Sequence, residues 1–215
     1  MTNMLQWIKS LIFVVIMYIA LPIYGLMYTP AAIRAPKGAV DACHAYARFV
    51  IKMADVLLGL KTEVRGTPPT GEVLVAAKHQ SFFDVFLIYS AVPWAKFIMK
   101  AILAYAPVFG QFTQRLGCIP VQRGKRGAAI KKMLEDVRTG QAEPGQVIIY
   151  PQGTRVAPGE YKPYKPGTAA LYTELGQPCI PVATNVGVFW PKRGILRKPG
   201  LAVVEFMDPI EPGMD

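Results

Sequence analysis

The pattern of apolar and polar positions divides this chain near residue 60. Residues 11–28 are apolar without a charge, and residues 38–58 alternate polar and apolar positions at helical spacing. Beyond residue 70, short apolar runs of strand length alternate with helical stretches. That alternation predicts a mostly parallel sheet covered by helices. We therefore expect an α/β domain over residues 59–215, preceded by a membrane-associated two-helix element over residues 1–58.

The individual elements of the α/β domain follow from the period of their apolar positions. Apolar and β-branched runs predict strands at residues 73–77, 95–99, 118–122, 146–150, 179–183 and 201–206. Apolar positions that recur every three or four residues predict helices at 82–90, 108–116, 127–138 and 167–175.

The apolar run at residues 11–28 would form a straight helix about 27 Å long, slightly short of a hydrocarbon core of about 30 Å. Pro22 and Gly25 are expected to interrupt it, because a proline inside a helix removes a backbone hydrogen bond. We expect the two N-terminal helices to lie in the membrane interface with their apolar faces in lipid. A secretory signal for the first run, and a helix packed on the core for residues 38–58, are the alternatives. Whether the first helix spans or lies in the bilayer stays open.

The charge balance indicates an anionic partner. The chain has 24 basic and 14 acidic residues, a net charge of +10. Residues 96–138 hold nine basic and two acidic side chains, and residues 155–198 hold seven and two. Without a helix-turn-helix, zinc or RNA-binding motif, nucleic acid is not the expected partner, and phosphate groups or anionic lipid are. The three widely spaced cysteines are expected to be reduced thiols facing a cytosol-like compartment.

The candidate chemistry begins at His79, which follows the predicted strand 73–77 and precedes the predicted helix 82–90. Catalytic groups gather at such strand ends in α/β sheets. Asp84, five residues on, can hold the imidazole in one tautomer. The stretch from Ser81 to Asp84 equally fits a helix-capping box, in which Asp84 binds a backbone N–H instead. No Gly-x-Ser-x-Gly motif is present, so Ser81 is the less favoured nucleophile.

Cations follow three other predicted strands. Arg155 stands on the loop Gln152-Gly153-Thr154-Arg155, Arg123 follows the strand 118–122, and Lys100 follows the strand 95–99. Parallel strands end at one edge of their sheet, so these side chains are expected near His79. A guanidinium binds phosphate through two parallel hydrogen bonds. Each cation alone is usually a solvated surface charge, and it is their coincidence at strand ends that favours a binding site.

These clusters resemble the motifs of the glycerolipid acyltransferase superfamily, most of all those of the 1-acyl-sn-glycerol-3-phosphate acyltransferases. His-x4-Asp matches His79 and Asp84, and Gly-x-Ile-x-x-x-Arg matches Gly117, Ile119 and Arg123. Phe-Pro-Glu-Gly-Thr-Arg matches Pro151, Gly153, Thr154 and Arg155, with Gln152 in place of the usual glutamate, and a Val/Ile-Pro-Val strand matches residues 180–182. Lys100 falls where the family often carries a lysine.

The resemblance implies an enzyme of the membrane surface, expected at the cytoplasmic face of a bacterial inner membrane, that needs no cofactor or metal. It would move an acyl group from acyl-CoA or acyl carrier protein to 1-acylglycerol 3-phosphate, giving phosphatidic acid. His79 would act as general base and Asp84 would orient it. Backbone N–H groups near Ser81 would stabilise the oxyanion. The substrate-binding residues would be Lys100, Arg123, Gln152, Gly153, Thr154 and Arg155.

Gln152 leaves the headgroup of the acceptor open, because it lacks the negative charge of the family's glutamate. Another lysophospholipid is therefore an alternative acceptor. A thioester or lipid hydrolase using the same His–Asp pair also fits these motifs, as does a lipid-binding protein without catalysis.

Overall fold

The computed structural model describes residues 2–122, 131, 134–135 and 145–214. Within them, seven strands form one sheet in the order β1-β7-β6-β2-β5-β3-β4. All neighbouring strands are parallel except β6 and β7. The predicted mostly parallel α/β sheet is confirmed. The strands are β1 (Leu60–Gly66), β2 (Leu74–Ala77), β3 (Ala95–Lys100), β4 (Ile119–Val121), β5 (Gln146–Ile149), β6 (Cys179–Thr184) and β7 (Gly200–Phe206).

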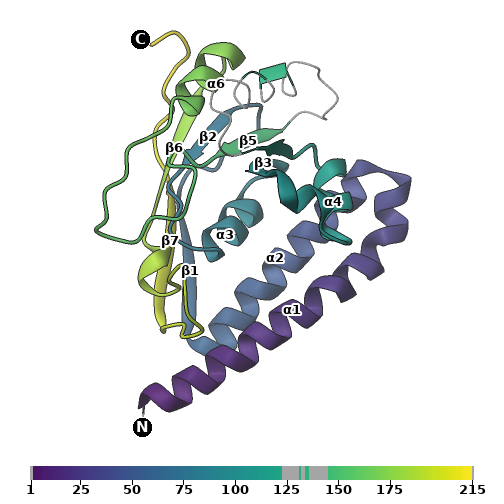
Figure 1. The fold of residues 1–215 in the computed structure, drawn as a ribbon, viewed down its shortest axis with the longest axis vertical. Coiled ribbons are helices and arrows are strands. Elements are labelled where there is room, and N and C mark those ends of the chain that lie inside the picture. The colour runs from purple at the N-terminus through teal and green to yellow at the C-terminus, as the bar shows by residue number, and fades with distance from the viewer. Residues whose placement is uncertain (1, 123–130, 132–133, 136–144, 215) are drawn as a thin grey trace.

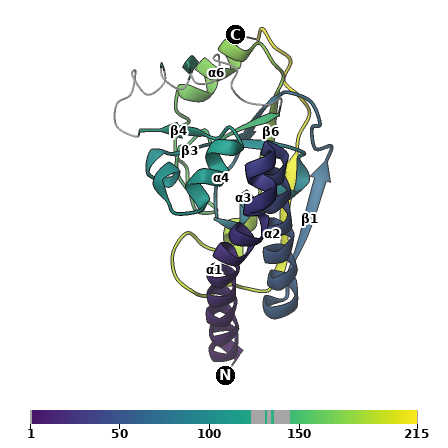
Figure 2. The same ribbon diagram turned by 90° about the vertical axis from the view of Figure 1, so that its right-hand side faces the viewer.

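The described helices lie around this sheet (Figures 1 and 2). They are α1 (Thr2–Arg34), α2 (Pro36–Leu58), α3 (Phe83–Ala91), α4 (Phe109–Arg115) and α6 (Gly167–Leu175), with short 3₁₀ helices η1 (Ala101–Tyr105) and η2 (Val186–Val188). The predicted bounds of α6 are confirmed. The helix predicted at 127–138 lies mostly outside the described residues. Of the sheet strands, β1 was missed, because its polar and charged residues point to solvent at the sheet edge.

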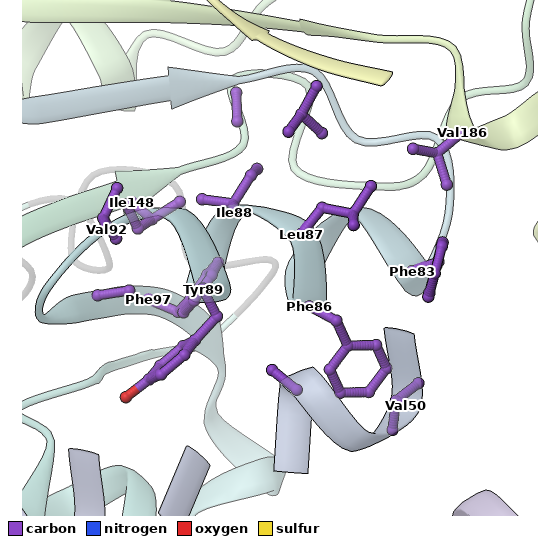
Figure 3. Close-up of a cluster of buried hydrophobic side chains, with 14 of the residues drawn as sticks. Val50, Phe83, Phe86, Leu87, Ile88, Tyr89, Val92, Phe97, Ile148 and Val186 are labelled. Atoms are coloured by element: carbon purple, nitrogen blue, oxygen red, sulfur yellow. The ribbon is translucent and has the colours of Figure 1, made fainter. Parts of the chain in front are cut away.

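Alternation along the central strands gives the sheet two apolar faces. Val75 and Ile148 belong to the cluster that includes α2 and α3, whereas their neighbours Leu74 and Val147 pack with Leu171 of α6. Figure 3 shows the first cluster, with α3 lying between the strands and α2. The helix that follows His79 is therefore enclosed on both sides, which fixes the start of α3 relative to the sheet.

α2 is a core helix. Val50 and Ala54 are fully buried, and Ala47 and Leu58 nearly so. The expectation that the apolar face of this helix lies in lipid is therefore wrong, and the alternative of a helix packed on the core is correct. Its polar side holds the exposed residues expected from the sequence, such as Arg48. α2 contacts both α3 and β1, and the domain boundary at residue 58 stays a proposal.

α1 is one continuous helix, so the expected interruption at Pro22 and Gly25 is wrong. Gly25 instead makes room for Val108, because a Cβ at Gly25 would lie only 2.4 Å from a methyl carbon of Val108. The stretch from Met4 to Arg34 is the one described helix that is long and apolar enough to cross a membrane, judged by length and composition. Many of its apolar side chains are exposed.

Candidate active site

His79 and Asp84 form a direct pair at the carboxyl edge of the sheet. His79 follows β2, and Asp84 lies in the first turn of α3. His79 Nδ1 lies 2.9 Å from Asp84 Oδ1. Asp84 is fully buried, while the histidine side chain keeps 16% of its surface exposed. With Nδ1–H donated to the carboxylate, the lone pair of His79 is on Nε2, which is the arrangement that a general base requires.

The second oxygen of Asp84 binds the backbone of the turn that precedes α3. Asp84 Oδ2 accepts the backbone N–H groups of Gln80 and Ser81, both at 2.8 Å. Ser81 Oγ in turn accepts the N–H of Phe83 at 3.1 Å. The sequence left two interpretations of Asp84 open, a contact with His79 or a hydrogen bond from a backbone N–H. Both contacts occur, because each uses a different oxygen of the carboxylate. The reciprocal bond of a full capping box is not the one seen, since Ser81 Oγ accepts the N–H of Phe83 rather than that of Asp84.

Those hydrogen bonds correct the expected oxyanion site. The N–H groups of Gln80, Ser81 and Phe83 already donate within the turn. A turn whose donors are occupied has little to offer a developing negative charge. The expectation that the backbone near Ser81 stabilises the oxyanion is wrong for these three groups.

Tyr150 is a site residue that sequence reasoning missed. It follows β5, and its ring stacks on the imidazole of His79 with centroids 3.9 Å apart. Its hydroxyl lies 3.5 Å from Asp84 Oδ1 and donates weakly to it. Burial, reinforced by the charge of Asp84, raises the pKa of Tyr150 well above its ordinary value, so the phenol stays protonated. The signal for it was its position at a strand end beside the Gly-Thr-Arg loop.

The turn that carries His79 is tied to two distant segments. The N–H of Val156 donates to the carbonyl of His79 at 2.8 Å. The buried side chain of Gln80 accepts the N–H of Gly187 through Oε1 at 3.0 Å. The loop after β5 and the segment after β6 therefore both hold the turn in position.

The loop from Pro151 to Arg155 reaches the site as expected, but its members have different surroundings. Gly153 has a positive φ of 64°, and a Cβ there would lie 2.9 Å from Nζ of Lys165. The structure thus adds a cation, Lys165, beside the loop. Thr154 and Arg155 are half-buried.

Gln152 is turned into the protein. Its side chain is 2% exposed, and its Nε2 donates to the carbonyl of Lys162 at 3.0 Å. The amide therefore joins the two ends of the segment between β5 and α6, and the predicted contact of Gln152 with substrate stays a prediction.

The two remaining predicted cations are Lys100 and Arg123. Lys100 is exposed at the end of β3, on the expected edge of the sheet. Arg123 lies outside the described residues. Their expected contacts with substrate stay predictions.

A cavity of about 410 Å³ adjoins this site, and we call it the lateral cavity. Phe82, the residue between Ser81 and α3, lines it, as does Arg155. The remaining lining residues come from α1 and from the segment between η2 and β7; they are Val14, Met17, Tyr18, Trp190, Lys192, Gly194, Ile195 and Arg197. Sequence reasoning did not single out Lys192 or Arg197, which follow no predicted strand.

Comparison with known proteins identifies the family of this chain. Residues 61–185, more than half of the chain, match the family model described as Acyltransferase. The chain belongs to the Acyltransferase family. The resemblance found in the four motifs is thereby confirmed, and the matched residues include His79, Asp84 and the Gly153–Arg155 loop.

Two bacterial relatives carry the same name. The 1-acyl-sn-glycerol-3-phosphate acyltransferase of Pseudomonas aeruginosa is 31% identical over 157 residues, which are 72% of this chain and 61% of that protein. The chain thus spans less than two thirds of that relative. The protein of the same name from Escherichia coli K12 is 28% identical over 211 residues, which are 95% of this chain and 83% of that protein.

A solved structure shares the fold of this acyltransferase. The crystal structure of the 1-acyl-sn-glycerophosphate (LPA) acyltransferase PlsC from Thermotoga maritima superposes with a TM-score of 0.79. The superposition covers 99% of this chain and 88% of that one, at 20% sequence identity. The likeness includes the N-terminal helices as well as the α/β sheet.

Proposed function

We propose that this protein transfers a fatty acyl group from a thioester, acyl-CoA or acyl carrier protein, to the sn-2 hydroxyl of 1-acylglycerol 3-phosphate, giving phosphatidic acid. The observation that carries the proposal is the 2.9 Å contact between His79 Nδ1 and the buried Asp84, beside a cavity lined by Arg155. The names of the relatives support the same acceptor.

The chemistry follows from the tautomer that Asp84 sets. His79 Nε2 takes the proton of the acceptor hydroxyl as its oxygen attacks the thioester carbonyl carbon, a role worth about 10²–10⁴ in rate. The C–S bond then breaks, and the imidazolium returns its proton to the departing sulfur. Asp84 stabilises the imidazolium in between, because the carboxylate is held by two backbone N–H groups and keeps one oxygen for the ring.

The acceptor's phosphate is assigned to the cations at the strand ends. Arg155 is the cation of this set that the structure places in the lateral cavity. Lys100 and Arg123 are proposed as further phosphate ligands, with Gly153 and Thr154 shaping the loop and Gln152 holding it. The protein is proposed to act at the cytoplasmic face of a bacterial inner membrane, where the exposed apolar side chains of α1 would meet lipid.

The test uses the full-length protein, labelled acyl-CoA and a panel of lysophospholipids, with the products identified by mass spectrometry. We expect acylated 1-acylglycerol 3-phosphate from the unaltered chain, and a loss of about 10²–10⁴ in kcat for His79→Ala. The matched control is His44→Ala. His44, the other histidine of the chain, is half-buried on α2, where it contacts the carbonyl of Pro93 and the ring of Tyr89 rather than the His79–Asp84 pair. Its loss should therefore leave turnover within about twofold.

Three outcomes would contradict the proposal. Near-normal turnover by His79→Ala would remove the mechanism. Free fatty acid as the main product would make the protein a hydrolase. Preference for a lysophospholipid with a zwitterionic headgroup would keep the reaction and change the acceptor.

A further inference from the structure

The lateral cavity has a cationic side that the four sequence motifs do not explain. Arg155 comes from the matched family region, but Lys192 and Arg197 lie beyond residue 185, where that match ends. Nζ of Lys192 donates to the backbone carbonyl of Arg155 at 3.1 Å, which joins the two segments. Of the ten described residues that line the cavity, none is acidic.

Arg197 is buried without a carboxylate partner among the contacts that the structure describes. The residue is 8% exposed, and its Nη1 donates to the carbonyls of Gly194 and Leu196. Its Nε is buried and has no hydrogen-bond partner among the described residues. The guanidinium lies 4.4 Å from the ring centroid of Trp190, a cation–π contact. A buried charge is costly unless an opposite charge or hydrogen bonds compensate it, so this arrangement is suited to receiving an anion.

Electrostatics agree with that interpretation. Burial lowers the pKa of Arg197 to about 10, with the charge of Arg155 acting in the same direction and Tyr18 opposing it. A guanidinium with that pKa is still charged at neutral pH. An incoming anion would therefore meet a fixed positive charge rather than a neutral group.

α1 holds the backbone of Arg197. Ser10 Oγ accepts the N–H of Arg197 at 2.9 Å, and Gln6 Nε2 donates to its carbonyl at 2.9 Å. Phe13 packs edge-on against Trp190, with centroids 5.4 Å apart. The polar residues in this otherwise apolar helix thus position the cation at the cavity wall.

The rest of the lateral cavity is apolar. Val14, Met17 and Tyr18 of α1 line one side, and Phe82 brings the cavity to the turn of His79 and Asp84. A cavity with a cluster of cations and an apolar wall fits a ligand with one charged end and one hydrocarbon chain. A small anion would leave the apolar wall in water, and a neutral lipid would leave the cations unpaired.

We propose that Lys192 and Arg197, together with Arg155, bind the phosphate of the single-chain acceptor, and that its acyl chain lies against α1. This inference rests on the proposed function. It assigns selection of the acceptor to two residues outside the matched family region.

The test measures binding without turnover, in full-length His79→Ala protein in nonionic detergent. The probes are 1-oleoylglycerol 3-phosphate, 1-oleoylglycerol, which lacks the phosphate, and glycerol 3-phosphate, which lacks the chain. We expect the first probe to bind at least about tenfold more tightly than either of the others, the size of one charge-assisted hydrogen bond or one buried apolar group.

Adding Lys192→Gln or Arg197→Gln to this protein should reduce that preference for the phosphate about tenfold, the size of one charge-assisted hydrogen bond. Lys192→Gln removes the charge and keeps an N–H donor on a side chain that is one bond shorter. The matched control is Lys198→Gln, an exposed lysine of the same segment that does not line the cavity. It should leave the preference unchanged.

If Arg197→Gln does not fold, Lys192→Gln still tests the inference, because Lys192 is exposed and its substitution leaves the core intact. An unchanged phosphate preference in Lys192→Gln would overturn the inference. The inference would also be overturned if Lys192→Gln weakened the binding of free coenzyme A and left the binding of the lysolipid unchanged, because the cavity would then serve the acyl donor. Phosphate-dependent binding without any turnover by the unaltered chain would instead overturn the proposed function alone.

Discussion

The two oxygens of Asp84 have different partners, and this division decides how firmly His79 is held. One oxygen accepts the imidazole N–H at 2.9 Å, and the other accepts the backbone N–H groups of Gln80 and Ser81 in the turn before α3. Because these two bonds fix the carboxylate, the backbone of the turn also sets the orientation of the ring. Tyr150 covers one face of that ring and keeps the pair partly out of water.

Gln152 has a structural role in this chain. It stands where the motif Phe-Pro-Glu-Gly-Thr-Arg has glutamate, and its amide donates to the carbonyl of Lys162 from a buried position. A carboxylate of the same shape has no N–H to donate, and it would face a carbonyl oxygen.

Gln152→Glu is therefore expected to lower the free energy of unfolding by about 1–3 kcal/mol, the cost of leaving buried polar atoms unpaired. In a chain of this size that corresponds to roughly 2–4 °C in Tm for each kcal/mol. Thermal unfolding of the purified variants measures it. Gln152→Met, which loses the bond without adding a charge, is the control and should lose less. A Gln152→Glu protein as stable as the unaltered chain would contradict the observed hydrogen bond.

At the scale of elements, the α1–α2 hairpin depends on one close approach of two backbones. A Cβ at Gly38, in the first turn of α2, would lie 2.3 Å from the carbonyl carbon of Ala31 in α1. Real Cβ atoms do not approach so closely, so an alanine there must push the helices apart. That displacement would reach Val50 and Ala54, which carry the contact of α2 with the core.

Gly38→Ala is accordingly expected to destabilise the protein, by about 1–3 kcal/mol from overpacking, offset by roughly 1 kcal/mol from better helix propensity. Urea unfolding followed by circular dichroism gives the difference. Gly71→Ala is the control, because a Cβ there meets nothing within 4 Å, and it should change stability by less than about 0.5 kcal/mol. If Gly38→Ala and Gly71→Ala were equally stable, α1 and α2 could move apart without loss of stability, and the prediction would be wrong.

At the scale of the whole molecule, the two N-terminal helices, α1 and α2, have different surroundings. α2 completes the core, whereas α1 contributes to the lateral cavity on one side and exposes an apolar stripe on another. Ile12, Val15, Ile19, Ile23 and Leu26 follow one another at helical spacing and are all exposed. An apolar stripe of that kind fits a membrane surface.

Deleting residues 1–58 would remove the core residues of α2 as well, so substitution is the sharper test of membrane association. Ile19→Gln with Leu26→Gln is expected to weaken binding to vesicles of phosphatidylethanolamine and phosphatidylglycerol by roughly tenfold or more, since each apolar side chain contributes about 1.5–3 kcal/mol when buried.

Flotation of the protein with the vesicles measures this binding, and circular dichroism confirms the fold. The control carries Val64→Gln and Met207→Gln, two exposed apolar residues outside α1, and should float like the unaltered chain. If both variants float equally well, the attachment to lipid lies elsewhere on the molecule.

Much of the α/β architecture could be predicted because its signals are local. Strand period, helix period and turn residues placed α6 within its observed bounds and the central strands within one or two residues. The His79–Asp84 pair was also predictable, since five residues across a strand–turn–helix junction leave the two side chains close together. β1 was not, because its exposed face is polar and its partner β7 lies far along the chain.

By itself, then, the sequence determined which residues are apolar, where the chain turns, and which acid lies near which histidine, because all of these depend on neighbours along the backbone. The tertiary structure alone decided what covers each apolar face: protein for α2, and the lateral cavity for part of α1. It also decided that Lys192 and Arg197 meet Arg155, and that Gln152 points inward. The physical reason is that apolar side chains leave water equally well for lipid or for protein, so only the packing of distant segments selects between them.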